Sequence, residues 1–173
     1  VLAKNQDADL MSVVGTTVRL AQEHGVEMGN VFIDDTGVGA GVSDRLREQG
    51  HKVNAVKNGE TARNTEQFIN KRAENYWKLK KWLGIGNKLL SSDDWSELMS
   101  MKYKSDSSGK LKMMSKDEMR TLGIESPDVA DALSMTFDRD SLLRAVSTDK
   151  EFEKMMLKKE KKKQGGNYQM KMT

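Results

Sequence analysis

Two pairs of aspartates have the residue types and the spacing to do chemistry. Asp34 and Asp35 end the apolar run VFIDD and precede the glycine-rich segment TGVGAGV. Asp128 and Asp131 lie three residues apart in the segment SPDVADALSMTF, so a helix there would place both carboxylates on one face. A carboxylate at a strand end and two on a nearby helix could hold one or two divalent ions. Such ions would activate water for attack on a phosphodiester.

The glycine-rich segment after Asp34 is open to three interpretations. Its backbone N–H groups could bind a phosphate, but Val42 stands where a dinucleotide fingerprint needs its third glycine, and no Gly-Lys-Ser/Thr follows. The segment could also be a structural turn, with the aspartates as strand-end caps. In a metal site, Gly37, Gly39 and Gly41 would allow a tight turn and leave room for a substrate. The metal interpretation is favoured because it also uses the aspartates of the later helix, which could otherwise only complement the helix dipole.

The composition limits the kind of protein and the kind of metal site. The chain of 173 residues is 36% hydrophobic and 32% charged, which fits one domain with polar appendages. It has no cysteine and only two histidines, so a metal site would use carboxylates, which suit hard ions such as Mg²⁺ or Mn²⁺. No apolar run approaches the roughly 18 residues of a membrane span, and the first residues lack the zones of a signal peptide. We therefore expect a soluble, cytoplasmic protein.

A basic segment ends the chain. After Lys150 the sequence has seven lysines and three glutamates, a net charge of +4, compared with +3 for the whole chain. Such a segment buries little apolar surface. We expect residues 141–173 to form a flexible tail, which would either keep the protein soluble or attract nucleic acid without sequence preference.

Alternating helical and extended patterns predict an α/β domain. The expected helices cover residues 7 or 9 to 24, 43–49, 65–83, 93–103 and 126–137, and the expected strands cover 31–34, 51–56 and 110–114. The strand at 31–34, the helix at 43–49 and the strand at 51–56 would form a strand, crossover helix, strand unit. Met11, Val14, Val18 and Ala21 follow a helical spacing in the first helix, and Trp95, Leu98 and Met99 are expected to face inward in the helix at 93–103.

The helix starts carry recognisable capping signals. Ser92 is the expected N-cap of the helix at 93–103. The segment SKDE predicts a capping box between Ser115 and Glu118. Ser126 is the expected N-cap of the last helix, with Pro127 at its first position.

Four blocks of sequence, in this order and spacing, resemble a known family. The blocks are VFIDDTGVGAGVSDRLREQGHKV, NKRAENYW, SGKLKMMSKDEMR and SPDVADALSMTF. They resemble the carboxyl-terminal nuclease domain of the large terminase subunit of tailed bacteriophages, over roughly Asp9 to Phe137. The resemblance implies a ribonuclease H-like fold, a mixed sheet flanked by helices. The final Asp-x-x-Asp-Ala-Leu also resembles the catalytic helix of Holliday-junction resolvases, which share that fold.

The resemblance implies a function and a set of site residues. The family's domain cuts concatemeric double-stranded DNA during genome packaging and uses two divalent ions, Mg²⁺ or Mn²⁺. Asp34 and Asp131 match its strand-end and helix carboxylates, with Asp128 in support. The pleat of the strand points Asp35 to the opposite face, so only one of the two neighbouring aspartates can reach the metal site. Arg72 and Lys116 match basic positions, where they would contact DNA phosphate or orient a carboxylate; ordinary surface or packing cations are the alternative. The implied partners are double-stranded DNA and, in the parent protein, the terminase small subunit and the portal. The implied location is the cytoplasm of an infected or lysogenic host carrying a phage or prophage.

One departure from the family pattern changes the expectation for this chain. The family's first carboxylate lies on an opening strand in a block resembling G-x-D-x-A, and that block and the two strands after it are not in this sequence. We therefore expect an amino-terminally truncated domain over residues 1–140, followed by the tail at 141–173. No ATPase motif Gly-x-x-x-x-Gly-Lys-Ser/Thr occurs. The isolated chain is expected to be a weak nuclease or, alternatively, a non-catalytic DNA-binding or assembly fragment.

Overall fold

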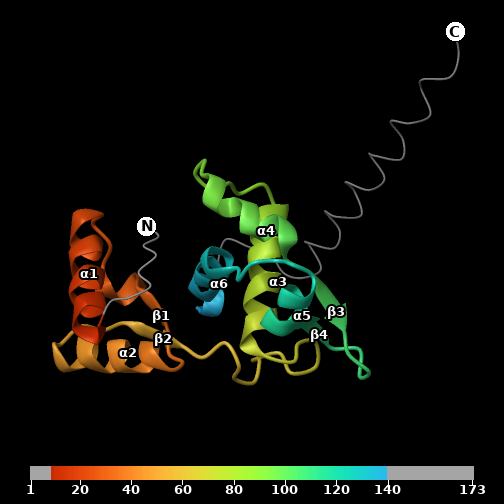
Figure 1. The fold of residues 1–173 in the computed structure, drawn as a ribbon, viewed down its shortest axis with the longest axis horizontal. Coiled ribbons are helices and arrows are strands. Elements are labelled where there is room, and N and C mark those ends of the chain that lie inside the picture. The colour runs from red at the N-terminus through yellow and green to blue at the C-terminus, as the bar shows by residue number, and fades with distance from the viewer. Residues whose placement is uncertain (1–8, 140–173) are drawn as a thin grey trace, which may run out of the picture.

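The computed structural model describes residues 9–139 as helices and two small sheets (Figure 1). The elements in chain order are α1 (Leu10–Glu23), the 3-10 helix η1 (Met28–Asn30), β1 (Phe32–Asp34), α2 (Val38–Glu48), β2 (Asn54–Val56), α3 (Lys71–Gly84), η2 (Asp93–Ser96), α4 (Glu97–Ser100), β3 (Tyr103–Ser105), β4 (Leu111–Met113), α5 (Lys116–Thr121), α6 (Asp128–Met135) and η3 (Thr136–Asp138). The predicted tail at 141–173 lies outside the described residues. Within 9–139, no helix has the length and apolar character of a membrane span.

The first part of the fold is a strand, helix, strand unit with a helix packed on it. β1 and β2 pair in parallel, with Phe32 opposite Asn54 and Asp34 opposite Val56. α2 makes the crossover, and α1 packs against it. Their shared core contains the buried side chains of Val14 and Leu46. The predicted α/β arrangement of this part is therefore confirmed.

The second part is built around α3. β3 and β4 form an antiparallel hairpin, with Lys104 opposite Lys112. Near α3, Phe68 forms an isolated bridge with Leu111. The core of this part contains Tyr76, Leu79, Met113 and other buried apolar side chains of α3 and α6. α6 also contacts β1, so this one helix joins the two parts, as its position between them in Figure 1 shows.

Several predicted local features are confirmed and others are wrong. Asp9 caps α1 by accepting hydrogen bonds from two backbone N–H groups, and the capping box between Ser115 and Glu118 is present. The expected inward position of Met99 is wrong, because it is 88% exposed, and Met11, which follows the helical spacing of α1, is 49% exposed. Met99 lies on a single turn of α-helix that follows η2, because the expected helix at 93–103 is interrupted and residue 103 already belongs to β3.

Three helix starts differ from the expectation. α2 begins at Val38, five residues before the predicted start, and so includes two of the glycines assigned to a turn. α3 begins at Lys71, six residues later than predicted, after Asn70 as N-cap. α6 begins at Asp128, with Pro127 rather than Ser126 at the cap position. Contacts distant in sequence account for two of these differences: Ile69 N–H donates to the carbonyl of Leu111 before α3, and Glu97 accepts from the first N–H groups of α6.

A candidate active site at the ends of β1 and α6

Asp34 is exposed at the carboxyl end of β1. The backbone N–H of Asp35 donates to the carbonyl of Val56 at 2.8 Å, which continues the pairing of β1 with β2 past Asp34. The hydroxyl of Thr36 donates to Asp34 Oδ1. Gly37 follows with φ of 58°, a left-handed conformation that favours glycine, and ends the turn into α2. The strand end and this turn therefore fix Asp34 at the edge of the parallel pair.

Two of the glycines have a different role from the one predicted. A Cβ at Gly39 would lie 1.8 Å from the backbone oxygen of Asp34, and one at Gly41 would lie 2.3 Å from a side-chain carbon of Leu10. Both glycines are inside α2, so they allow this helix to approach the strand end and α1 closely. Only Gly37 serves the turn; the expectation that all three glycines form a tight turn is wrong.

Asp35 has partners of its own, separate from those of Asp34. Its side chain is only 13% exposed, and its carboxylate accepts a hydrogen bond from the hydroxyl of Ser43 in α2. Lys57, just after β2, lies 3.7 Å from its other oxygen. The two neighbouring carboxylates therefore differ in both contacts and exposure.

Asp131 is a buried carboxylate held by two side chains of α3. Arg72 Nε donates to Asp131 Oδ1 at 2.9 Å, and the hydroxyl of Tyr76 donates to the same oxygen at 2.8 Å. The side chains of Arg72 and Asp131 are each only 13% exposed. Arg72 is fixed further because its Nη1 donates to the carbonyl of Met114 at 2.9 Å. Both bonds to Asp131 end on Oδ1, and Oδ2 accepts no hydrogen bond from the described residues.

Tyr76 is a member of the site that the sequence alone did not reveal. Its ring is buried in the core around α3, and the guanidinium carbon of Arg72 lies 5.5 Å from the ring centroid. Burial raises the pKa of the Tyr76 hydroxyl well above its ordinary value, and the adjacent charge of Asp131 raises it further. The phenol therefore stays protonated and donates its hydrogen bond to Asp131. Its spacing of four residues from Arg72 in α3 is the sequence signal that could have indicated it.

Asp128 lies in a different environment from Asp131, although the two share the first turns of α6. Its side chain is 62% exposed and lies 3.6 Å from Lys116 Nζ. The hydroxyl of Ser126 donates to Asp128 Oδ1 at 2.6 Å, so Ser126 bonds a side chain rather than the helix backbone. An exposed pair such as Lys116 and Asp128 adds little stability. The two predicted basic residues therefore lie beside different carboxylates, Arg72 beside Asp131 and Lys116 beside Asp128.

Glu97 caps α6, and sequence reasoning missed it. Its Oε2 accepts hydrogen bonds from the backbone N–H groups of Val129 at 2.8 Å and Ala130 at 3.0 Å. A carboxylate at this position satisfies two donors that the helix leaves free and complements its dipole. Glu97 lies more than thirty residues earlier in the chain, so no capping pattern near Ser126 could have indicated it.

Asp34 and Asp131 are ligands of the type that a hard divalent ion prefers, but two carboxylates do not complete its shell. Within residues 9–139, no three His, Asp or Glu side chains are grouped closely enough to form a metal site by themselves. Mg²⁺, however, is commonly bound by one or two carboxylates together with waters and substrate phosphates. Asp34 and Asp131 each keep one carboxylate oxygen that accepts no hydrogen bond from the described residues, and α6 packs against β1.

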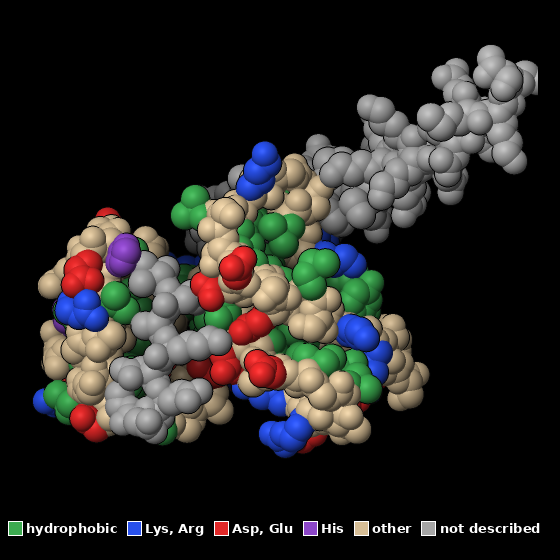
Figure 2. All heavy atoms as spheres, turned by 45° about the horizontal axis from the view of Figure 1, so that its top comes forward, with side chains coloured by type: hydrophobic (Ala, Val, Ile, Leu, Met, Phe, Trp, Pro, Cys, Tyr) green, Lys and Arg blue, Asp and Glu red, His purple; other side chains and the backbone are tan. Residues whose placement is uncertain are grey.

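A surface hollow lies away from these carboxylates. A cavity of about 320 Å³ opens between α1 and the turn before β2, beside Met11, Arg19 and His51. None of the predicted site residues lines it. On another face, Asp and Glu side chains gather between the two parts of the fold (Figure 2).

No protein-family model matches the chain, and no curated protein matches it significantly. Solved structures do match. The nuclease domain of the large terminase subunit gp2 of bacterial virus Sf6 superimposes with a TM-score of 0.65 at 27% identity, covering 79% of this chain and 76% of that one. A mutant of that domain with manganese gives 0.65 at 26% identity, covering 79% and 77%. A mutant with calcium gives 0.64 at 27%, covering 79% and 76%. The chain is therefore similar, in sequence and in its ribonuclease H-like α/β fold, to the nuclease domain of a phage large terminase subunit.

Proposed function

We propose that this chain is a metal-dependent endonuclease domain that cuts double-stranded, concatemeric DNA during phage genome packaging. Asp34 and Asp131 would be its catalytic carboxylates and metal ligands, with Asp128 in support. The observation that carries the proposal is the setting of Asp131, a buried carboxylate in a nuclease fold whose Oδ1 is held by Arg72 and Tyr76. A carboxylate fixed through one oxygen presents the other in a defined direction.

The residues of the site have separate roles in this proposal. A bound Mg²⁺ or Mn²⁺ would supply an activated water and neutralise charge on the scissile phosphate. Asp131 would hold such an ion through Oδ2, while its two donors restrict rotation of the carboxylate. Asp34, exposed at the strand end, would hold it from the other side. Lys116 is exposed beside Asp128 and would contact a DNA phosphate.

The comparisons support this proposal at the level of the domain. The similar structures are nuclease domains of a terminase large subunit, and two of those mentioned above were solved with manganese or calcium. Double-stranded DNA would be the substrate, and the terminase small subunit and the portal would be partners of the complete protein. The site of action would be the cytoplasm of the infected or lysogenic host.

A second candidate is a non-catalytic fragment that binds DNA or takes part in assembly. The observation that favours it is the absence of a preformed group of three metal-binding side chains among residues 9–139. On this view the contact of Arg72 with Asp131 is a buried ion pair that joins α3 to α6. Such pairs occur for structural reasons alone.

The test is cleavage of supercoiled plasmid DNA in Mn²⁺ by the full chain and by Asp34→Asn and Asp131→Asn. Asparagine keeps an oxygen that can accept the bonds from Arg72 and Tyr76 but removes the charge. Asp44→Asn is the control, because Asp44 is an exposed acid whose ion-pair partner, Arg47, is also on α2. We expect both site variants to lose nicking by at least a hundredfold and the control to keep it.

The same proteins should be titrated with Mn²⁺ by electron paramagnetic resonance. The site variants should bind the ion at least tenfold more weakly, while their circular dichroism spectra stay unchanged. If the unaltered chain binds Mn²⁺ no better than either variant and cuts no DNA, the second candidate is correct for this chain.

A further inference from the structure

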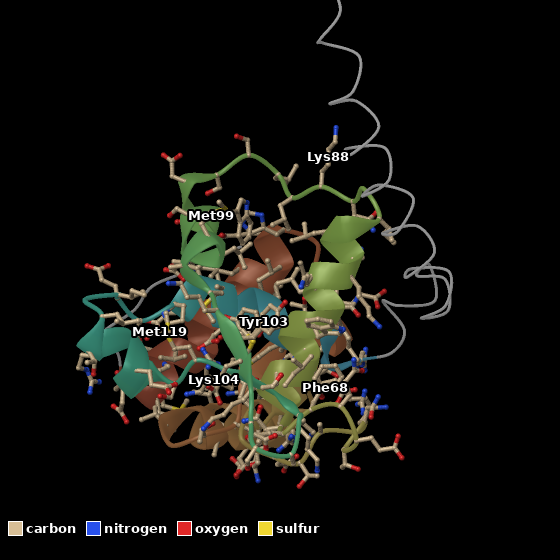
Figure 3. All side chains as sticks on the ribbon, turned by 90° about the vertical axis from the view of Figure 1, so that its right-hand side faces the viewer. Phe68, Lys88, Met99, Tyr103, Lys104 and Met119 are labelled. Carbon is tan, nitrogen blue, oxygen red and sulfur yellow. The ribbon has the colours of Figure 1, made fainter. Side chains whose placement is uncertain are left out.

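Four lysines share the outer face of the hairpin formed by β3 and β4. Side chains alternate along a strand, so Lys102 and Lys104 lie on one face of the first strand, and Lys110 and Lys112 on one face of the second. The pairing of Lys104 with Lys112 puts all four on the same side. We call these four residues the lysine face. Figure 3 shows the hairpin with Lys104 labelled.

The opposite face of the hairpin packs against α3. Tyr103 makes an edge contact with the ring of Trp77, with centroids 5.4 Å apart, and Met113 is buried in the core around α3. Lys80 of α3 lies 4.3 Å above the Trp77 ring and 3.2 Å from the Tyr103 hydroxyl. These contacts fix the hairpin on α3, so the lysine face is the side that points away from α3; Lys102 and Lys104 are exposed on it, and Lys110 and Lys112 are half-buried.

The lysine face is short of counter-charge. Lys104 forms an ion pair with Glu118 of α5, and its hydrogen bond is the main reason that the pKa of Glu118 falls to about 2. Lys102, Lys110 and Lys112 have no ion-pair partner among the described residues. Like charges directly opposite on paired strands destabilise a hairpin, so Lys104 and Lys112 would gain from an anion placed over them.

The charge of this face contrasts with that of the rest of the structure. Residues 9–139 contain 19 lysines and arginines and 20 acids, whereas residues 102–112 contain four lysines and one acid. That acid, Asp106, is turned into the hairpin loop, where it accepts bonds from the backbone N–H groups of Ser108 at 2.9 Å and Lys110 at 2.8 Å. The local excess of positive charge is therefore not cancelled within the hairpin.

The lysine face is connected to the candidate site through a short path. Met114, which follows β4, accepts a hydrogen bond from Arg72, the residue that holds Asp131. α5 begins two residues later with Lys116, which lies beside Asp128. The same helix carries Glu118, the partner of Lys104. Met114 and Lys116 therefore link the lysine face to the residues around the candidate carboxylates.

We propose that the lysine face binds the phosphate backbone of double-stranded DNA and guides the duplex to the carboxylates of Asp34 and Asp131. The proposal rests on the proposed function in one respect, that duplex DNA is the substrate. Lysines two residues apart on a strand are about 6.8 Å apart, which is about two charge intervals of roughly 3.4 Å on one DNA strand. Each lysine of a pair can thus meet a separate phosphate.

The test is metal-free binding of the full chain to a fluorescent 24-base-pair duplex, followed by anisotropy in EDTA over a range of KCl concentrations. The variant is the triple substitution Lys102→Gln, Lys110→Gln, Lys112→Gln, which spares the ion pair of Lys104. The control replaces Lys52 and Lys88, two exposed lysines outside the hairpin, with glutamine. A rescue variant places arginine at the same three hairpin positions and keeps the charge.

Each phosphate contact contributes about 0.9 to the slope of log affinity against log salt. We expect the triple variant to lower that slope by two to three and to weaken binding at least tenfold, while the control changes the slope by less than one for its two lysines. The arginine variant should restore the wild-type slope. If the slope falls no more in the triple variant than in the control, and the unfolding temperatures are unchanged, the proposal is overturned. It is also overturned if the triple variant loses as much affinity for poly-glutamate as for DNA, which would indicate an acidic protein partner instead.

The outcome is separable from that of the proposed function. Binding in EDTA needs neither metal nor cleavage, so the lysine face could bind DNA in a chain that does not cut it.

Discussion

Replacing Tyr76 with phenylalanine removes one hydroxyl from the candidate site and leaves the buried ring in place. The hydroxyl donates to Asp131 at 2.8 Å, and a hydrogen bond to a charged group contributes about 1.5–3 kcal/mol to stability. Arg72 continues to donate to the same oxygen, so Asp131 is not left unpaired. We therefore expect the lower end of this range, a loss of about 1.5 kcal/mol. For a domain of this size the unfolding temperature would fall by about 5 °C.

The same substitution should weaken metal binding. Groups that orient a metal ligand without touching the metal typically change affinity by about 10–100-fold. Because one of the two donors to Asp131 remains, we expect Mn²⁺ affinity to fall by about tenfold in Tyr76→Phe. Isothermal titration calorimetry with Mn²⁺ measures the affinity, and urea unfolding followed by circular dichroism measures stability.

Tyr103→Phe is the matched control for this substitution. Its hydroxyl contacts Lys80 at the surface, and the residue is 49% exposed, so its loss should change stability by less than about 0.5 kcal/mol and leave Mn²⁺ affinity unchanged. Two results would refute the reasoning in different ways. Unchanged stability in Tyr76→Phe would show that the hydrogen bond contributes nothing. Reduced stability with wild-type Mn²⁺ affinity would make Tyr76, Arg72 and Asp131 a structural network rather than a positioning one.

Three further predictions follow from the contacts around the site. Gly39→Ala should destabilise the fold by about 3 kcal/mol in urea unfolding, because its Cβ would lie 1.8 Å from the backbone oxygen of Asp34. Gly29→Ala, which has open space around its Cβ, should change stability by less than about 1 kcal/mol in the same assay. Glu97→Ala should cost about 2 kcal/mol by removing the acceptor for two N–H groups of α6, and Glu97→Gln, which keeps an acceptor, should cost less in the same assay. Raising the pH above about 10 should destabilise the wild type relative to Tyr76→Phe by up to about 1.4 kcal/mol per pH unit. The pKa of Tyr76 is raised in the folded state, so the stability that its hydroxyl contributes is complete below the unfolded-state pKa and is lost as the pH rises. Parallel curves of unfolding free energy against pH for the two proteins would contradict this.

Features that depend on near neighbours could be predicted from the sequence. The Asp9 cap and the Ser115 to Glu118 capping box involve residues two or three apart, and side-chain type and spacing suffice to predict them. The strand, helix, strand unit around β1 and β2 follows from a similarly local alternation of apolar and polar positions. The resemblance of four ordered blocks to a terminase nuclease domain also came from sequence, and the superposition with solved structures confirmed it.

The assembly of the site depends on tertiary packing. Arg72 and Asp131 are 59 residues apart, and Glu97 is 32 residues from Val129, the first of the two residues whose N–H groups donate to it. Sequence patterns carry no information about which distant side chains meet, because that depends on how α3, α4 and α6 pack around a shared core. Gly39 looked like a turn residue for another reason, because its critical contact is only five residues away but depends on the path of the backbone. Its requirement for glycine comes from the backbone of Asp34 in the adjacent strand end, a contact that exists only once α2 has folded back over β1.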